Sequence, residues 1–335
     1  MSLARPQIVS WNLIRQVTGF SADELRSVAE RAGGLYESRD RLAHKAKKPK
    51  WRHIDDPVPE LKRIQKALVR GLLRPIPLPA FFCGSVSGRS PVDAIKPHVG
   101  RPSILALDLR DFFPRTSHKR VYRAWTRVVG CSPEIAGVLT QLTTLHRRLP
   151  QGAPSSPPLA NLAFLEIGLA IESACRNAGL RVTFFVDDIL ISGDQPGTVL
   201  DEIIDLLQQS GYGVKRSKME FMGPRERHAA LGAVFNRFIS YGRGPFAILR
   251  QRILALIDSA EVTPSQIRSL TGAAHYVRFL NKNQGDKLLA LIVQLRPTVE
   301  DSPREPKAQW ETCRGGNKCK AKPRSSRPLV TTTGS

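Results

Sequence analysis

Short apolar runs in the middle of the chain predict buried β-strands, and aspartates mark their ends. Residues 103–107 read Ser-Ile-Leu-Ala-Leu and lead directly into Asp108, with Phe112 and Phe113 close behind. Two further runs, 182–186 and 189–192, lie on either side of Asp187 and Asp188. Two such runs around a short turn are typical of a β-hairpin. We expect the two aspartates at that turn, because Asp tolerates unusual backbone angles better than most residues.

Apolar residues at helical spacing predict helices before and after these strands. Residues 1–40 read as helical, with Ser21 and Glu24 forming a capping box. A Pro/Gly/Ser loop at 149–158 leads into an apolar helix, and residues 231–242 alternate loosely enough for another hairpin. The remaining helical segments are 60–73, 160–174, 199–210 and 246–296.

This pattern divides the chain into four parts. Residues 1–45 form an N-terminal helical segment, 46–240 a central α/β unit and 241–299 a second helical unit. Residues 300–335 carry many basic and few aliphatic residues, so they are expected to form a disordered basic tail.

Charge narrows the range of partners. The 335 residues include 51 Lys+Arg against 29 Asp+Glu, which gives a formal net charge of +22. A surplus of this size is expected to attract a polyanion such as nucleic acid. No apolar run approaches the roughly 18 residues of a membrane helix, and the N-terminus lacks the features of a secretory signal. Five widely spaced cysteines suggest free thiols in a reducing compartment, so a cytoplasmic protein without a membrane partner is expected.

The aspartates supply candidate chemistry. Asp187 and Asp188 adjoin each other between apolar residues, so their mutual repulsion has to be offset by a cation. Hard carboxylate oxygens favour Mg²⁺ or Mn²⁺. If the strand that ends at Asp108 lies beside the hairpin, three carboxylates converge as two-metal phosphoryl transfer requires. For the hairpin alone, a solvated turn is the alternative, since two-residue turns often use Asp.

Several motifs taken together resemble the bacterial reverse transcriptases of the retron type, over roughly residues 40–280. In chain order they are Lys-Trp-Arg at 50–52, Asp-Leu-Arg-Asp-Phe-Phe at 108–113, Leu-Pro-Gln-Gly at 149–152, Phe-Val-Asp-Asp at 185–188, Lys218, and Leu-Gly at 231–232. The resemblance implies an α/β (α+β) right-hand polymerase. Residues 46–240 would form the fingers and an antiparallel-sheet palm, and 241–299 a helical thumb. It also implies an RNA-directed DNA polymerase that takes dNTPs and an RNA template and makes DNA.

By the same resemblance, Asp108, Asp187 and Asp188 match the carboxylates that bind two Mg²⁺ ions, with Mn²⁺ as a possible substitute. Lys218 matches the lysine near the leaving pyrophosphate, where it can donate a proton or neutralise charge. An ordinary surface lysine is the alternative.

The nucleotide site would draw on three motifs. Phe113 matches the aromatic gate that excludes a 2′-hydroxyl, while Phe112 is expected in the core. Leu109, which follows Asp108 in the same motif as Phe113, is also expected at the nucleotide site. Gln151 and Gly152 match the loop at the incoming nucleotide and template, although an ordinary Pro/Gly turn would look the same. Lys50 and Arg52 resemble the fingers residues that hold the triphosphate, for which the guanidinium fork is well suited.

Further residues are expected to contact nucleic acid. Phe185, in place of the usual Tyr, and Gly232, in a hairpin resembling the primer grip, would lie near template or primer. Tyr276 could lie against the duplex backbone, with core packing as an equal alternative. The helix that carries Lys62, Arg63 and Lys66 would lie near the template.

Departures from the family pattern leave its exact membership open. The stretch 94–98 keeps only the His of a motif usual in retrons, and 230–232 reads Ala-Leu-Gly where Val-Thr-Gly is usual. A defence-associated or group II intron-like enzyme, a polymerase-inactive RNA-binding scaffold and a template-independent polymerase are the alternatives. At family level, the role would be to make single-stranded DNA from a cognate noncoding RNA in antiviral defence, with an effector protein encoded nearby.

Overall fold

The computed structural model describes residues 10–42 and 51–300. Lys50 and residues 301–335, which hold nearly all of the expected basic tail, lie outside the described residues.

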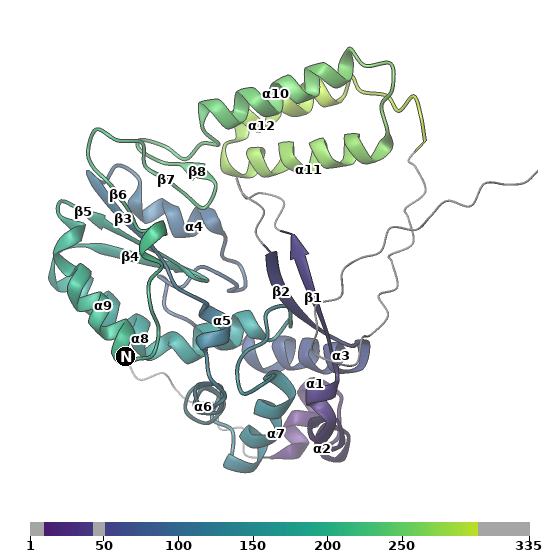
Figure 1. Ribbon diagram of the computed structural model, residues 1–335, viewed down its shortest axis with the longest axis vertical. Helices are drawn as coiled ribbons and strands as arrows, with labels where there is room; N and C mark the ends of the chain where they lie inside the picture. The colour runs from purple at the N-terminus through teal and green to yellow at the C-terminus, as the bar shows by residue number, and fades with distance from the viewer. Residues whose placement is uncertain (1–9, 43–50, 301–335) are drawn as a thin grey trace, which may run out of the picture.

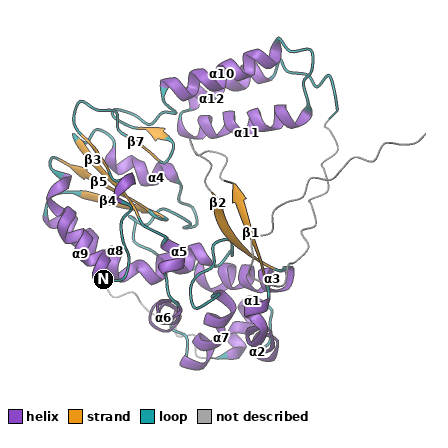
Figure 2. Cartoon of the chain, viewed as in Figure 1, coloured by secondary structure: helices purple, strands orange, loops and turns teal. Residues whose placement is uncertain are grey.

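A four-stranded antiparallel sheet forms the palm (Figures 1 and 2). Its strand order is β4-β5-β3-β6, and its strands are β3 (Ser103–Asp108), β4 (Arg181–Phe185), β5 (Asp188–Gly193) and β6 (Glu220–Met222). Alternation along β3 directs Leu105 and Leu107 into the main core and Ile104 into a smaller one on the other face. The strands and the hairpin predicted around Asp108 and Asp187–Asp188 are therefore confirmed.

Helices cover both faces of this sheet. The long helix α8 (Ser156–Asn177) and α9 (Leu200–Gln209) pack on one face, and the short α4 (Pro91–Ile95) lies over the other (Figure 1). By length and composition, α8 is the one helix within the described ranges that could cross a membrane. Because 61% of its apolar window is buried inside the protein, a core position accounts for its composition.

The fingers combine helices with a β-hairpin that extends beyond the palm (Figure 1). Residues 36–42, predicted to belong to the N-terminal helical segment, form strand β1 (Tyr36–Leu42) and pair antiparallel with β2 (Trp51–Pro57). That assignment was wrong because the strand is charged and exposed and has no apolar periodicity. Pairing with β2 supplies its hydrogen bonds. The predicted helix over 60–73 is confirmed as α3 (Pro59–Leu68), followed by a π-helical turn over 69–73.

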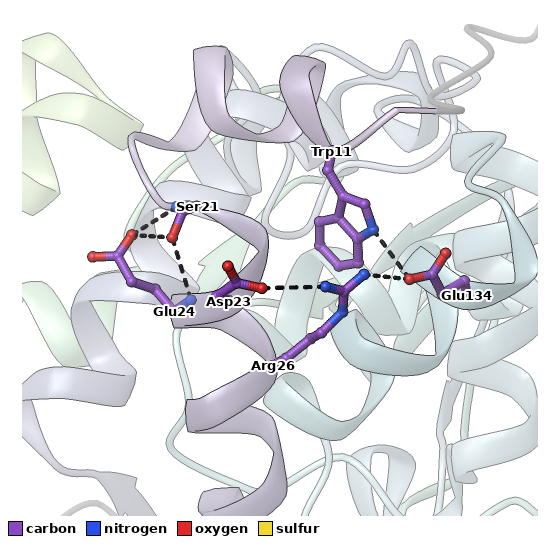
Figure 3. A network of polar contacts seen from close by, with 6 residues as sticks. All are labelled: Trp11, Ser21, Asp23, Glu24, Arg26 and Glu134. Carbon is purple, nitrogen blue, oxygen red and sulfur yellow. Dashed lines mark hydrogen bonds and ion pairs between the residues drawn. The ribbon is translucent and has the colours of Figure 1, made fainter.

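Two short helices, α1 (Trp11–Thr18) and α2 (Ala22–Arg31), attach the N-terminal segment to the body of the fingers (Figure 3). The capping box predicted at the start of α2 is present, with Ser21 and Glu24 bonding reciprocally. Arg26 pairs with Glu134 at 2.5 Å, and the same carboxylate oxygen accepts a hydrogen bond from the Trp11 indole at 3.2 Å. Glu134 belongs to α7 (Pro133–Thr143), so this network ties α1 and α2 to the middle of the chain.

The remaining fingers and palm helices are short: α5 (Phe112–Arg115) and α6 (His118–Arg123). A small hairpin, β7 (Ala229–Ala230) and β8 (Ala233–Val234), leads from the palm to the thumb, so a hairpin surrounds Gly232 as expected. It begins before the predicted span of 231–242, and beyond β8 that span pairs through an isolated bridge between Val234 and Ser240. The thumb consists of α10 (Arg243–Ile257), α11 (Pro264–Leu280) and α12 (Lys282–Ile292) around its own core, as the helical pattern over 246–296 predicted. In Figure 1 the thumb faces the β1–β2 hairpin from above. The expected fold class is confirmed.

Candidate active site

Two of the predicted carboxylates lie on neighbouring palm strands in direct register. Asp108 ends β3 and Asp188 begins β5, and the two residues are partners in the antiparallel ladder. The Leu109 N–H donates to the Asp187 carbonyl at 2.8 Å, which extends the pairing into the turn. The sequence expectation that three aspartates come together at this end of the sheet is therefore met by the backbone.

The turn that presents Asp187 is strained at Val186. Val186 has φ +60°, which is unusual for a β-branched residue, whereas neither Asp187 nor Asp188 has a positive φ. The expectation that the aspartates would carry the unusual backbone angle was wrong. A two-residue hairpin loop of the type that matches strand twist needs a positive φ at its first position, and Val186 occupies that position.

Neighbouring segments hold this turn in place. Gly84 packs so closely on Val186 that an added Cβ would collide with its backbone nitrogen. The Gly84 carbonyl in turn accepts a hydrogen bond from the Asn161 side chain at 2.7 Å, and the Cys83 N–H donates to Phe184 at 2.8 Å. Strain supported in this way from several sides is characteristic of functional turns.

Two lysines pair with Asp108. Lys215 Nζ lies 2.6 Å from Asp108 Oδ1, and Lys218 contacts Oδ2 of the same carboxylate. A backbone hydrogen bond also joins Lys215 to Asp108, because the Lys215 N–H donates to the Asp108 carbonyl at 2.8 Å. Lys218 was predicted from its motif. Lys215 was missed, although its position three residues before Lys218 is the signal that could have identified it.

Burial and the acidic cluster together raise the pKa of Asp188. Burial is the main cause, and the negative charges of Asp187 and Asp108 add to it, so that the pKa rises to about 6. The pKa of Lys218 is also raised, chiefly by its hydrogen bond with Asp108. The site therefore concentrates negative charge in a partly desolvated place, where a further cation would be stabilised.

These groups border a cavity of about 720 Å³ between fingers, palm and thumb. The predicted residues that line it are Arg52, Phe113, Gln151, Phe185, Asp187, Asp188, Lys218 and Tyr276. Asp108 lies beneath the lysines and is only 5% exposed. Trp51, His53 and Asp111 also line the cavity and were not singled out from the sequence. Trp51 and His53 directly flank Arg52, which could have indicated them.

The adjacent phenylalanines divide as expected. Phe112 is 4% exposed and packs against Phe164 and Tyr212 in the core, with one edge at the cavity wall, whereas Phe113 is only half-buried and presents its ring to the cavity. The backbone explains the division. Asp111, with φ +48°, forms the turn that begins α5, so Phe112 and Phe113 occupy successive positions of that helix and their side chains point in different directions.

The loop with Gln151 and Gly152 is attached to the fingers strand β2. The Asp55 N–H donates to the Gln151 carbonyl at 2.8 Å. Gly152 has φ +136°, and a Cβ there would lie 2.8 Å from both the Asp55 carbonyl oxygen and Ile54 Cγ2. Only glycine fits this position, so the loop is more than an ordinary turn: it fixes Gln151 relative to the fingers hairpin.

The thumb closes the cavity through the small hairpin. Tyr276 Oη donates to the Leu231 carbonyl at 3.1 Å, and a Cβ on Gly232 would lie 3.2 Å from that same hydroxyl. Leu231 and Gly232 both have positive φ, as the tight two-residue hairpin loop requires. The core alternative for Tyr276 is excluded, since its side chain is exposed.

Some predicted residues lie elsewhere. The Leu109 side chain is fully buried in the core, because the backbone at the end of β3 directs it inward. The prediction that this side chain lies in the nucleotide site was therefore wrong. Lys62, Arg63 and Lys66 line a different groove, of about 560 Å³, beside α1. There Lys62 pairs with Asp56 at 2.5 Å, and the Arg63 guanidinium lies 5.4 Å from the centre of the Phe20 ring.

Within residues 10–42 and 51–300, the side chains of His, Cys, Asp and Glu form no group of three or more placed to hold a metal ion. The three aspartates nevertheless offer the hard oxygen ligands that divalent ions such as Mg²⁺ prefer. Two ammonium groups already lie against Asp108, which shows that this carboxylate attracts positive charge.

Comparisons with known proteins agree with this geometry. Residues 43–235, more than half of the chain, match the family described as "Reverse transcriptase (RNA-dependent DNA polymerase)". The chain belongs to the reverse transcriptase family. Members of this family are RNA-directed DNA polymerases, which copy an RNA template into DNA and generally use divalent metal ions.

Individual relatives of this reverse transcriptase are retron enzymes. It is 26% identical to the Retron Ec86 reverse transcriptase of Escherichia coli over 306 residues. This alignment covers 90% of this chain and 94% of the relative. It is 28% identical over 284 residues to the Retron Mx65 reverse transcriptase of Myxococcus xanthus, with 78% and 62% covered. Over 149 residues it is 32% identical to the Retron Se72 reverse transcriptase of Salmonella heidelberg (strain 579083-10), with 44% and 39% covered. These similarities support a reverse transcriptase of the retron type.

Proposed function

We propose that this reverse transcriptase extends a primer with dNTPs at the cavity between fingers, palm and thumb, with two divalent cations held by Asp108, Asp187 and Asp188. The observation that carries the proposal is the register of Asp108 opposite Asp188, with Asp187 in the adjoining turn. Mg²⁺ is the expected ion, and Mn²⁺ can replace it because both accept carboxylate oxygens.

The residues present fit such ions. All three candidate ligands are carboxylates. Burial, together with the negative charges of Asp187 and Asp108, raises the pKa of Asp188 to about 6, and bound cations would relieve the repulsion between these charges. When bound, the ions would activate the attacking hydroxyl and stabilise the leaving oxygen. Lys215 and Lys218 would have to release oxygens of Asp108 for this, and both side chains already line the cavity and are long enough to swing away from the carboxylate.

The chain's own residues supply the rest of the reaction. A primer 3′-hydroxyl, or an RNA 2′-hydroxyl in retron-type priming, attacks the α-phosphorus, and pyrophosphate leaves. Arg52, together with Lys50, would hold the triphosphate. Lys218 would give a proton or a positive charge to the leaving group, and Lys215 lies close enough to share that task.

Phe113 and Gln151, which line the cavity, would select the incoming nucleotide. The Phe113 ring would lie against C2′ of the sugar, where a 2′-hydroxyl collides with it. Gln151 offers an amide that can bond to sugar or base, in a position that Gly152 fixes. Phe185, Gly232 and Tyr276 would guide primer and template between palm and thumb.

The biological part of the proposal rests on the named relatives, which are retron reverse transcriptases. We infer a cognate noncoding RNA as template, single-stranded DNA as product, a role in antiviral defence and an effector protein encoded nearby. The groove with Lys62, Arg63 and Lys66 would hold RNA outside the cavity. Buried free thiols at Cys83, Cys131 and Cys175 are consistent with a cytoplasmic location.

Sequencing of the nucleic acid that co-purifies with the protein tests this proposal. One defined RNA joined to one DNA species would support the retron assignment. A mixture of cellular RNAs without DNA would contradict it, while leaving the polymerase reaction to be tested separately by primer extension.

A further inference from the structure

A separate hollow, of about 410 Å³, lies where the palm meets the thumb. It shares no lining residue with the catalytic cavity. Its chemistry comes from Arg227, Arg237, Phe238 and Arg243, and we refer to these four residues as the arginine hollow. Arg227 precedes the β7–β8 hairpin, Arg237 and Phe238 follow it, and Arg243 begins α10.

A rigid turn presents Phe238 and Arg237. Val234 and Ser240 close the turn with two backbone hydrogen bonds of 2.8 Å, and Phe235 anchors it in the core without any exposed surface. Asn236 reinforces it, since its side-chain amide donates to the Glu226 carbonyl at 2.8 Å and accepts from the His228 N–H at 3.0 Å. The backbone that carries Arg237 and Phe238 is therefore in place before any ligand binds.

Gly242 makes room for Arg227. It has φ +83°, and a Cβ there would lie 3.2 Å from Arg227 Nη2 and 3.1 Å from Val234 Cγ2. A side chain at this position would crowd the guanidinium, so the glycine keeps the hollow open.

Charge and exposure indicate what the hollow can take. Arg227, Arg237 and Arg243 are exposed, and none of them has an ion pair in the part of the chain that the structure describes. The nearby Glu226 carboxylate accepts the Gly223 N–H at 2.7 Å. Phe238 is 67% exposed. One exposed apolar side chain is ordinary on a protein surface. An exposed phenyl ring on an anchored turn, among three guanidinium groups without an ion pair, however, matches the combination that binds single-stranded nucleic acid.

We propose that the arginine hollow binds an unpaired nucleic-acid segment, with one base stacked on Phe238 and the adjoining phosphates held by Arg227, Arg237 and Arg243. Guanidinium groups bond phosphate through two parallel N–H donors, and a phenyl ring accepts any base. RNA is the expected ligand because the enzyme uses an RNA template. The site is separate from the catalytic cavity, so this inference does not depend on the proposed metal mechanism.

The test uses the full-length protein and a photoreactive single strand, a 5-iodouridine-substituted RNA octamer, with the matching DNA octamer in parallel. Cross-linked peptides are identified by mass spectrometry, and affinity is measured by fluorescence anisotropy. We expect a cross-link at Phe238. We also expect Phe238→Ala to weaken RNA binding at least about fivefold, the lower end for loss of one stacked base. Phe221→Ala is the matched control, because Phe221 is 56% exposed on strand β6, outside the hollow.

Arginine variants test the binding of phosphate. Replacement of Arg237 and Arg243 by Gln should reduce the slope of log affinity against log salt by about 0.7 for each phosphate that the variant no longer neutralises. If the RNA and DNA octamers cross-link equally, the site is supported and also accepts the DNA product strand.

Absence of any cross-link within 227–243, or equal RNA affinity of Phe238→Ala and Phe221→Ala, would overturn the proposal. Primer extension on a short duplex should stay unchanged in Phe238→Ala, which separates this outcome from a failure of the catalytic site.

Discussion

Lys215 Nζ lies 2.6 Å from Oδ1 of Asp108, and Lys218 contacts the other oxygen of the same carboxylate. Asp108 is thus neutralised by the chain's own cations. Any divalent ion that binds Asp108 competes with these two ammonium groups, so they influence how strongly the site holds metal.

Removal of Lys215 is expected to strengthen metal binding. Lys215→Met takes away one competing cation, and Mn²⁺ affinity measured by electron paramagnetic resonance should rise about fivefold, or about 1 kcal/mol. Lys282→Met is the matched control, since Lys282 pairs with Asp286 at 2.7 Å on the thumb. Lys215→Arg keeps the charge and should bind Mn²⁺ like the wild type. Unchanged or weaker binding by Lys215→Met would show that Lys215 does not compete with the metal.

Phe113 is expected to set the choice of sugar. Phe113→Val opens space at C2′, and discrimination against ribonucleotides should fall by roughly 10- to 100-fold, as read from relative kcat/KM values for dNTP and rNTP. Phe164→Leu provides the control, because Phe164 is buried in the core beside Phe112 and does not line the cavity: it should lower stability and leave sugar selection intact. Equal selectivity in Phe113→Val and wild type would remove Phe113 from this role.

Gly152 is expected to be irreplaceable for reasons of space. Gly152→Ala would force a Cβ to within 2.8 Å of the Asp55 carbonyl oxygen, at a backbone angle that already disfavours alanine. Detachment of the loop from β2 should displace Gln151 and raise the KM for dNTP at least about tenfold. Gly211→Ala is the comparison, since Gly211 has φ +69° and no atom within 4 Å of such a Cβ, so only about 1 kcal/mol of strain is expected. If both variants behave alike, the contact with β2 does not matter.

His98 predicts a pH-dependent stability. Its ring is fully buried, its Nδ1 lies 2.6 Å from the Ser192 hydroxyl, and its Nε2 lies 2.8 Å from the Thr183 hydroxyl. Because the Thr183 hydroxyl donates to the Ala94 carbonyl at 2.8 Å, its oxygen accepts from Nε2–H, and Nδ1 accepts from Ser192. The ring is therefore neutral. Burial is the main reason that its pKa falls to about 3, and the positive charges of Arg181 and Arg101 add to the effect.

The sign of the effect follows from linkage. In the unfolded chain His98 titrates near its usual 6.5, so between about pH 6.5 and 3 the unfolded state binds more protons and stability falls as pH falls. The loss is about 1.4 kcal/mol per pH unit, or about 2 kcal/mol at pH 5. Urea unfolding of wild type and His98→Gln between pH 7.5 and 4.5 measures it. Parallel pH profiles for the two proteins would contradict a neutral buried ring.

The sequence predicted the centre of the molecule better than its edges, for physical reasons. Strands β3 and β5 are buried on both faces, so continuous apolar runs revealed them, and the aspartates at their ends followed. Strand β1 is polar and exists through its pairing with β2, which no local pattern encodes. Likewise, the close packing of Gly84 on the Val186 turn and the position of Lys215 on Asp108 both depend on the meeting of distant segments.

Primer extension on a defined RNA template with wild type and Asp188→Asn tests the central claim most directly. The wild type should incorporate dNTPs in the order that the RNA dictates and only with a divalent cation. Asp188→Asn should reduce the rate at least about a hundredfold through loss of one charge at the site. Asp194→Asn, an exposed aspartate just beyond β5, should behave like the wild type. Wild-type activity in Asp188→Asn, or a product whose sequence ignores the RNA, would contradict the account.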